Sequence, residues 1–252
     1  MWAWGSNTYG QLGNGTTISY SSPIQVGNLT NWKQVSCGWY SMSAIKTDGT
    51  LWACGYNALG QLGNGTTISY SSPIQVGNLT NWKQVSCGWY SMSAVKTDGT
   101  LWACGNNGSG QLGNGTTISY SSPIQVGSLT NWKQISTGAY NISTATKTDG
   151  TLWTWGYNAT GQLGNGTTIS YSSPIQVGNL TNWKQVSCNW YSMSAIKTDG
   201  TLWTWGYNNS GQLGNGTTIS YSSPIQVGSL TNWKQVSCGE YFTSAVTYAE
   251  II

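Results

Sequence analysis

The segment GQLGNGTTISYSSPIQVG, residues 10–27, decides the fold of this chain, because it returns unchanged four more times. The copies begin near Gly10, Gly60, Gly110, Gly161 and Gly211, so the period is 50 residues, with one extra residue in the third copy around residues 141–146. A long period that fills the chain from end to end is typical of stacked repeats such as propellers. We therefore interpret residues 1–252 as a single domain.

Each copy contains four short segments with the composition of β-strands. In the first copy they are residues 23–26, which begin with a proline, and residues 32–37, 41–46 and 51–55. The sequence TDGT at residues 47–50 predicts a tight turn between the last two strands. One such meander is too small to bury both of its faces, so it must stack on its neighbours. The repeat predicts an all-β fold, a single β-propeller of five four-stranded blades.

The two ends of the chain carry parts of one blade. Residues 1–5, MWAWG, match the fourth strand of a copy, whereas the fifth copy stops after its third strand near Thr247. We therefore expect the N-terminal strand to complete the last blade and close a monomeric ring, which removes an exposed sheet edge. Strand exchange between two chains is the competing arrangement.

Several motifs resemble those of a known family. The blocks GQLGNG, SSPIQV, WKQVSCG and KTDGTLWTWGYN are similar to the repeats of the regulator of chromosome condensation family. The resemblance implies a propeller, commonly of seven blades, among proteins that act as nucleotide exchange factors, light receptors or inhibitors. It therefore implies a fold and not one activity. The chain departs from the family at the position usually occupied by histidine, which here carries Tyr40, Tyr90, Tyr140, Tyr191 and Tyr241.

Composition argues against nucleic acid and membrane partners. Only 6% of the residues are charged, the net charge is +3, and the nine lysines recur at repeat positions instead of forming one patch. No stretch of about 18 apolar residues is present, and residues 1–15 lack the pattern of a signal peptide. We expect a soluble protein whose compartment the sequence does not indicate.

Groups for catalysis or metal binding are scarce. The chain has no histidine, and four of its six acidic residues, Asp48, Asp98, Asp149 and Asp199, lie in the TDGT turns, where aspartate accepts local hydrogen bonds. The six cysteines form no CxxC motif and are replaced by other residues in some copies, which favours a packing role. We predict a protein that is not an enzyme, with no metal site and no cofactor.

Positions that differ among the copies identify a candidate binding face. They fall into two groups, the segment after the fourth strand and the turn between the second and third strands, which a meander places at the same edge of every blade. Diversified loops on a constant scaffold are typical of a binding surface. The candidate binding residues are Tyr9, Trp39, Tyr40, Leu59, Trp89, Tyr90, Tyr140, Trp190, Tyr191, Glu240 and Tyr241.

The residues leave three functions open. The first is a non-enzymatic scaffold that binds a protein partner through the aromatic loops of this face. The second is a multivalent carbohydrate-binding, lectin-like propeller in which aromatic rings stack on sugars and equivalent sites act together. In the third, the near-identity of the copies reflects an engineered or recently amplified repeat with no specific ligand. Drift at exposed loop tips explains the variable positions equally well.

Overall fold

The computed structural model describes residues 1–188 and 190–248, and within this part all regular structure is β-strand. Each blade has four strand positions, which are given below in order from the centre of the arc outwards. The innermost strands are β3 (Trp32–Cys37), β7 (Trp82–Cys87), β11 (Trp132–Gly138), β15 (Trp183–Cys188) and β19 (Trp233–Cys238), and the second are β4 (Ser41–Lys46), β8 (Ser91–Lys96), β12 (Ile142–Lys147), β16 (Ser192–Lys197) and β20 (Thr243–Thr247). The third are β1 (Trp2–Gly5), β5 (Leu51–Gly55), β9 (Leu101–Gly105), β13 (Leu152–Gly156) and β17 (Leu202–Gly206), and the outermost are β2 (Tyr20–Gln25), β6 (Tyr70–Gln75), β10 (Tyr120–Gln125), β14 (Tyr171–Gln176) and β18 (Tyr221–Gln226). In the described residues, no helix is long and apolar enough to cross a membrane.

The sheets are antiparallel meanders in which each outermost strand comes from the following repeat. Four sheets have four strands, in the orders β3-β4-β5-β6, β7-β8-β9-β10, β11-β12-β13-β14 and β15-β16-β17-β18. Two further sheets have two strands each, β1-β2 and β19-β20. The sheet β19-β20 supplies the two inner strands of a blade, and the sheet β1-β2 supplies the two outer strands. Together the half-sheets contain the strands of a fifth blade.

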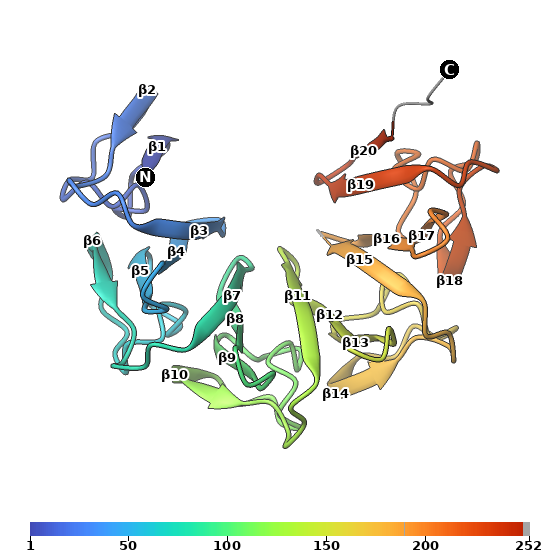
Figure 1. Ribbon diagram of the computed structural model, residues 1–252, viewed down its shortest axis with the longest axis horizontal. Helices are drawn as coiled ribbons and strands as arrows, with labels where there is room; N and C mark the ends of the chain where they lie inside the picture. Colours follow the sequence, from blue (N-terminus) through green and yellow to red (C-terminus); the bar gives the residue numbers. More distant parts are fainter. Residues whose placement is uncertain (189, 249–252) are drawn as a thin grey trace.

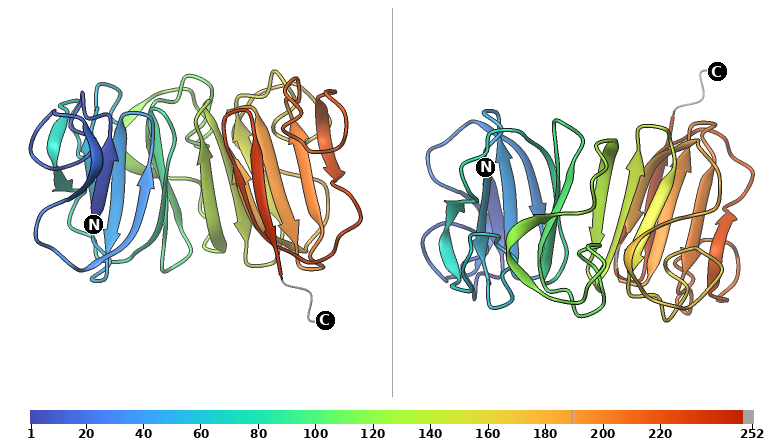
Figure 2. Two further views of the ribbon diagram at one scale, coloured as in Figure 1. Left: turned by 90° about the horizontal axis from the view of Figure 1, so that it is seen from above. Right: turned by 90° about the horizontal axis from the view of Figure 1, so that it is seen from below.

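The blades stand side by side around a centre and form an arc (Figure 1), with the strands running along the short axis of the molecule (Figure 2). Neighbouring inner strands are joined through side chains. The Gln34 amide donates from Nε2 to the Val85 carbonyl oxygen at 3.0 Å, and its Oε1 accepts from the Val85 amide at 3.1 Å. The same bonds join Gln84 to Ile135. Each of these bonds joins two residues that are 51 positions apart and lie on neighbouring blades. The bonds therefore fix the orientation of one blade against the next.

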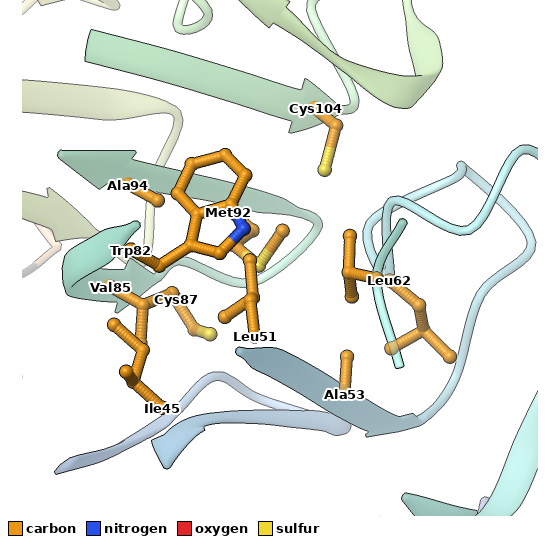
Figure 3. Close-up of a cluster of buried hydrophobic side chains, with 11 residues drawn as sticks. Ile45, Leu51, Ala53, Leu62, Trp82, Val85, Cys87, Met92, Ala94 and Cys104 are labelled. Carbon is orange, nitrogen blue, oxygen red and sulfur yellow. The ribbon is translucent and has the colours of Figure 1, made fainter. Parts of the chain in front are cut away.

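The core lies between blades and not within one. Leu51 of β5 and Trp82 of β7, which belong to neighbouring blades, point into the same cluster, together with Leu62, Val85 and Met92 (Figure 3). Full burial of an aliphatic side chain stabilises by about 1.5–3 kcal/mol. A blade therefore obtains its hydrophobic stabilisation only when a neighbour covers its face.

The predicted strands agree with the structure, except that the strand expected at residues 23–26 begins three residues earlier, at Tyr20, and ends one residue earlier, at Gln25. The pairing of β1 with β2 is irregular between Ala3 and Gly5, and Pro23 lies in this irregular part of an outer strand. A proline is tolerated there because the ladder needs no amide hydrogen from it. The predicted TDGT turn is present, with Gly49 at a φ of 79°. A Cβ at Gly49 would lie 2.0 Å from the carbonyl oxygen of Thr80 in the next repeat.

The extra residue of the third copy is absorbed in the turn between β11 and β12. β11 is one residue longer than the other inner strands, and Asn141 adopts a φ of 55°. Among the described residues other than glycine, no other has a positive φ. The Asn141 side chain accepts a hydrogen bond from Gln111 Nε2 at 2.9 Å, which holds the turn against the preceding blade.

The expected closure of the ring is not formed in this structure. β1 pairs with β2, β19 pairs with β20, and the two half-sheets lie on opposite sides of an opening in the arc (Figure 1). The physical reason is the orientation that the bonds between inner strands impose on successive blades. The resulting curvature leaves the two half-sheets apart after five repeats.

The exposed face beside β19 and β20 nevertheless has the shape of an incomplete blade contact. In the third and fourth blades Trp155 and Trp205 are fully buried, and their Nε1 atoms donate to the carbonyl oxygens of Gln111 and Gln162 at 2.9 and 3.0 Å. The equivalent indole is Trp4, which is 59% exposed. Beside β19 and β20, the position that such an indole fills in the other blades holds a cavity of about 330 Å³. Its lining includes Gln212, Leu213, Gly214, Val227 and Trp233.

Candidate functional site

The turns that follow the inner strands gather at one end of the arc and surround a cavity. This cavity has a volume of about 330 Å³ and is lined by residues from five turns, one per repeat. Glycine at the start of the turn allows the strand ends to approach closely, since a Cβ at Gly38 would lie 2.2 Å from the carbonyl oxygen of Gly88. The lining residues are Cys37, Gly38, Trp39, Cys87, Gly88, Trp89, Thr137, Ala139, Cys188, Trp190 and Glu240.

Three tryptophans from different blades meet beside this cavity. The rings of Trp39 and Trp89 stack with centroids 4.2 Å apart at 30°, and Trp89 meets Trp190 edge to face at 4.7 Å and 84°. Trp89 and Trp190 come from turns that are two repeats apart. The turn between them carries Ala139, so a small side chain stands where the other rings would have collided. Trp39 is 45% exposed, and Trp89 and Trp190 are half-buried.

A continuous network of aromatic rings extends outwards from these tryptophans. Each turn contributes a tyrosine, and these tyrosines contact rings that follow the third strands. Tyr40 lies 4.8 Å from Tyr9, and Tyr140 lies 5.6 Å from Tyr157. We call this network the aromatic face. Its rings are Tyr9, Trp39, Tyr40, Tyr56, Trp89, Tyr90, Tyr140, Tyr157, Trp190, Tyr191, Tyr207 and Tyr241.

The structure brings the candidate residues together, with one exception. Glu240 lines the central cavity, and the aromatic candidates all belong to the aromatic face. Leu59 occupies the place of Tyr9 one repeat later and, as an aliphatic residue, contributes no ring to the network. Sequence reasoning missed Tyr56, Tyr157 and Tyr207. The sequence did contain a signal for these tyrosines, because their position varies among the copies and holds Ser6 and Asn106 in two of them.

The hydroxyls of Tyr90, Tyr191 and Tyr241 remain protonated at neutral pH, because the pKa of each is raised. Burial raises the pKa of Tyr90, and the nearby Tyr56 and Tyr40 hydroxyls raise it further. Burial also raises the pKa of Tyr191, as does its hydrogen bond with Tyr140. The pKa of Tyr241 is raised by loss of solvation and by the hydrogen bond with Glu240. These three residues thus present neutral hydroxyl donors beside apolar surfaces.

The opposite end of the blades is uniform and carries the lysines and the aspartates of the described residues. The four aspartates of the TDGT turns act structurally, as Asp48 shows, since its Oδ1 accepts from the Thr50 amide at 2.9 Å and from its hydroxyl at 2.6 Å. The lysines that end β4, β8, β12 and β16 each lie over tryptophan. Lys46 Nζ is 3.6 Å from the ring centroid of Trp52 and 5.1 Å from that of Trp32. These contacts brace each blade at the end that does not vary.

The buried thiols have the surroundings of packing groups. The thiols of Cys54 and Cys188 are buried, which raises the pKa of each to about 12. At neutral pH they are therefore protonated and poor nucleophiles. Within residues 1–188 and 190–248, no group of three histidine, cysteine, aspartate or glutamate residues is placed to hold a metal ion.

The repeats match an established family model from one end of the described chain to the other. The model of the regulator of chromosome condensation (RCC1) repeat matches residues 1–45, 48–95, 98–142, 149–196 and 199–246. The chain belongs to the RCC1 repeat family. A second model of the RCC1 repeat matches residues 32–61, 82–111 and 183–212, which span the second, third and fourth strands of a copy.

Solved RCC1-type structures share the fold at low identity. Human WBSCR16 is 23% identical, with a TM-score of 0.86 over 98% of this chain and 67% of the other. Prp20p from Saccharomyces cerevisiae, studied for binding to Gsp1p and histones, is 18% identical, with a TM-score of 0.81 over 94% of this chain and 61% of the other. Yeast RCC1 (Prp20) bound to Kap60 is 18% identical, with a TM-score of 0.83 over 99% of this chain and 63% of the other. This RCC1-repeat chain thus spans about two thirds of each, and the likeness shows the fold alone.

Proposed function

We propose that this RCC1-repeat protein is a non-enzymatic binding scaffold that holds a protein partner on its aromatic face. The observation that carries the proposal is the meeting of Trp39, Trp89 and Trp190 from three blades beside one cavity. Tryptophan and tyrosine are enriched among the residues that dominate binding energy at protein interfaces. Their rings also supply a large contact area with little loss of conformational freedom.

Two further features support a protein partner. The aromatic face combines the loops that vary among the copies, whereas the TDGT turns on the opposite end are constant, as expected for a scaffold that presents a diversified surface. The yeast relative was studied for binding to Gsp1p and histones, and its structure was solved in complex with Kap60. For the present chain, such a role is an inference by analogy of fold.

The clefts between the blades give less support to a carbohydrate ligand. Equivalent clefts occur in the first and fourth repeats, lined by Trp32 and Trp52 in one and by Trp183 and Trp203 in the other. However, the ammonium of Lys46 lies 3.6 Å from the centroid of Trp52, so that ring face is not free to stack on a sugar. We therefore favour the protein-binding function.

The test is capture of partners by the intact chain and by a variant without the central rings. The triple substitution Trp39→Ala, Trp89→Ala and Trp190→Ala should abolish capture of a partner that the parent chain retains. A matched control places three substitutions at the opposite end, Leu29→Ala, Leu79→Ala and Leu129→Ala, at residues that are also exposed. Partners retained equally by all three proteins would overturn the proposal, and so would partners lost only from the control.

A further inference from the structure

The strand β20 has one edge without a neighbour. Among the described residues β20 pairs with β19, and no third strand lies on its other side. In the fourth blade this place belongs to β17, whose Trp205 lies opposite Met193 of β16. As a consequence Val246 of β20 is 53% exposed, whereas the equivalent Ile196 is fully buried. Such an edge offers unpaired backbone groups to an added strand.

The cavity beside this edge has room for an indole. In the fourth blade, a Cβ at Gly164 would lie 2.6 Å from Nε1 of Trp205. At the equivalent Gly214, the nearest atom to such a Cβ is Cγ1 of Val227, at 3.7 Å. The space that the indole fills in the fourth blade is therefore open beside β20. The lining of this cavity includes Leu202, Leu213, Gly214, Val227 and Thr243.

The cavity also contains a hydrogen-bond acceptor placed for an indole. In the third blade, the carbonyl oxygen of Gln111 accepts from the Ser143 hydroxyl at 2.9 Å and from Nε1 of Trp155 at 2.9 Å. In the last blade, the carbonyl oxygen of Gln212 accepts from the Thr243 hydroxyl at 2.9 Å, which reproduces the first of these bonds. A carbonyl oxygen has two lone pairs. The second lone pair of Gln212 can therefore accept from an indole N–H.

The small size of Thr243 favours tryptophan at this place. The equivalent position of the third strand holds cysteine in the first two blades, where Cys54 lies opposite the long side chain of Met42. In the third blade Trp155 lies opposite the small Ser143. A cysteine opposite Thr243 would leave a void, whereas an indole would fill the cavity.

The strand of this chain that could fill the place lies on the far side of the opening. Trp4 and Gly5 belong to β1, which pairs with β2 across the opening from β20 (Figure 1). Trp4 is 59% exposed there. Another polypeptide can therefore reach the cavity without displacing a strand of this chain.

We propose that β20 and this cavity bind an extended segment of a partner protein, which adds as a third strand and places a tryptophan in the cavity. A glycine must follow the tryptophan, because a Cβ at Gly206, directly after Trp205, would lie 2.3 Å from the carbonyl oxygen of Tyr191. Strand addition draws affinity from main-chain hydrogen bonds and specificity from a side-chain pocket. The site does not use the three central tryptophans, so it is independent of the proposed function.

The test uses the full chain and the synthetic peptide Thr-Leu-Trp-Thr-Trp-Gly-Tyr-Asn, which has the sequence of residues 201–208. Anisotropy of a dye on the peptide measures binding. Two variants of the peptide have the same composition, since Trp205→Ala removes the ring expected in the cavity and Trp203→Ala removes the other ring. In the fourth blade Trp203 contacts Lys197, but β20 carries Thr247 at that place. We expect Trp205→Ala to bind at least about ten-fold more weakly than Trp203→Ala.

Two variants of the chain connect binding to the cavity. Gly214→Ala places a Cβ where the indole would lie and should weaken binding of the peptide at least about ten-fold. Gly228→Ala is the matched control, because its φ of 60° is close to the 67° of Gly214 and a Cβ there meets no atom within 4 Å. This control should leave binding unchanged. Urea unfolding of the two variants should be alike, which separates a blocked cavity from an unfolded chain.

Three results would overturn the proposal. They are no binding of the peptide to the parent chain up to millimolar concentration, equal binding of the two peptide variants, and undiminished binding to Gly214→Ala. If the peptide binds to a Trp4→Ala chain but not to the parent, the cavity belongs to Trp4 of the same chain or of a second copy, and the proposal is wrong. Capture of partners by the triple tryptophan variant tests the proposed function in every case.

Discussion

Trp39 stacks on Trp89 at a centroid distance of 4.2 Å, although the two residues are a full repeat apart in the sequence. Each aromatic pair of this kind stabilises by about 0.5–1.5 kcal/mol beyond the area it buries. The contact therefore joins two blades at the surface, while the hydrophobic cluster around Leu51 and Trp82 joins them in the interior.

The first prediction separates binding rings from core rings. Substituting Trp39, Trp89 and Trp190 together by alanine should lower the free energy of unfolding by less than the single substitution Trp155→Ala. Truncation of a buried tryptophan such as Trp155 costs about 3–5 kcal/mol, whereas the triple variant loses rings that are partly in solvent. Urea unfolding of both variants measures the difference. A triple variant that unfolds at lower urea than Trp155→Ala would assign these rings to packing.

The second prediction concerns the two half-sheets of the opening. Complete blades pair Ser43 with Ala53, and the equivalent residues of the half-sheets are Ser244 and Ala3. If the half-sheets pair in solution, cysteines introduced at Ser244 and Ala3 will cross-link. Pairing within one chain would give a cross-linked monomer, which is favoured over a dimer because the effective concentration within one chain exceeds that between dilute chains.

Mass measurement after oxidation distinguishes the outcomes of this cross-linking. A cross-linked dimer would show that the half-sheets pair between chains, and absence of any new cross-link would show that the arc stays open in solution. The control pairs a cysteine at Ala3 with one at Ser194, a residue that already has a partner strand on each side.

The third prediction uses Trp4 to test whether the two half-sheets meet in solution. In the open arc this indole is 59% exposed, so Trp4→Ala should change the free energy of unfolding by about 0.5 kcal/mol or less. If Trp4 occupies the cavity beside Leu213, Val227 and Trp233, the cost rises to about 3–5 kcal/mol. The open arc of the structure predicts the smaller value, and a cost of about 3–5 kcal/mol would show that the arc closes in solution. A melting temperature equal to that of the parent would show that Trp4 does not enter the cavity.

The fourth prediction concerns acid stability. Hydrogen bonds from Thr50 lower the pKa of Asp48, and the other TDGT aspartates have the same partners. A pKa that is lower in the folded state gives stability that is present above the unfolded value, about 3.9. That stability is lost as the pH falls through the folded value.

We therefore expect the midpoint of urea unfolding to fall when the pH is lowered from about 4 towards 2. Replacing the four aspartates by asparagine keeps an acceptor oxygen in each turn but removes the titration, so this fall should become shallower. An equally steep fall in the fourfold variant would show that other groups are responsible. The substitutions are Asp48→Asn, Asp98→Asn, Asp149→Asn and Asp199→Asn.

Features that depend on local chemistry were predictable from the sequence. The period predicted the repeats, and the bounds of the inner strand β3 and of β4 and β5 agree with those predicted. The TDGT turn was equally clear, because a glycine such as Gly49 with positive φ and an aspartate that caps the turn are properties of a few adjacent residues. The variable positions also located the aromatic face, since strands that alternate in direction bring those loops to one edge.

Relations between repeats were decided only by the tertiary structure. The sequence shows that Trp89 and Trp190 are equivalent, but contact between them depends on the space that Ala139 leaves in the turn between. The opening of the arc likewise depends on the angle between blades. That angle is set by packing and by bonds such as Gln34 to Val85, which join residues 51 positions apart. Near-identical repeats specify the same blade each time, whereas small rotations summed over successive blades determine whether the two ends meet.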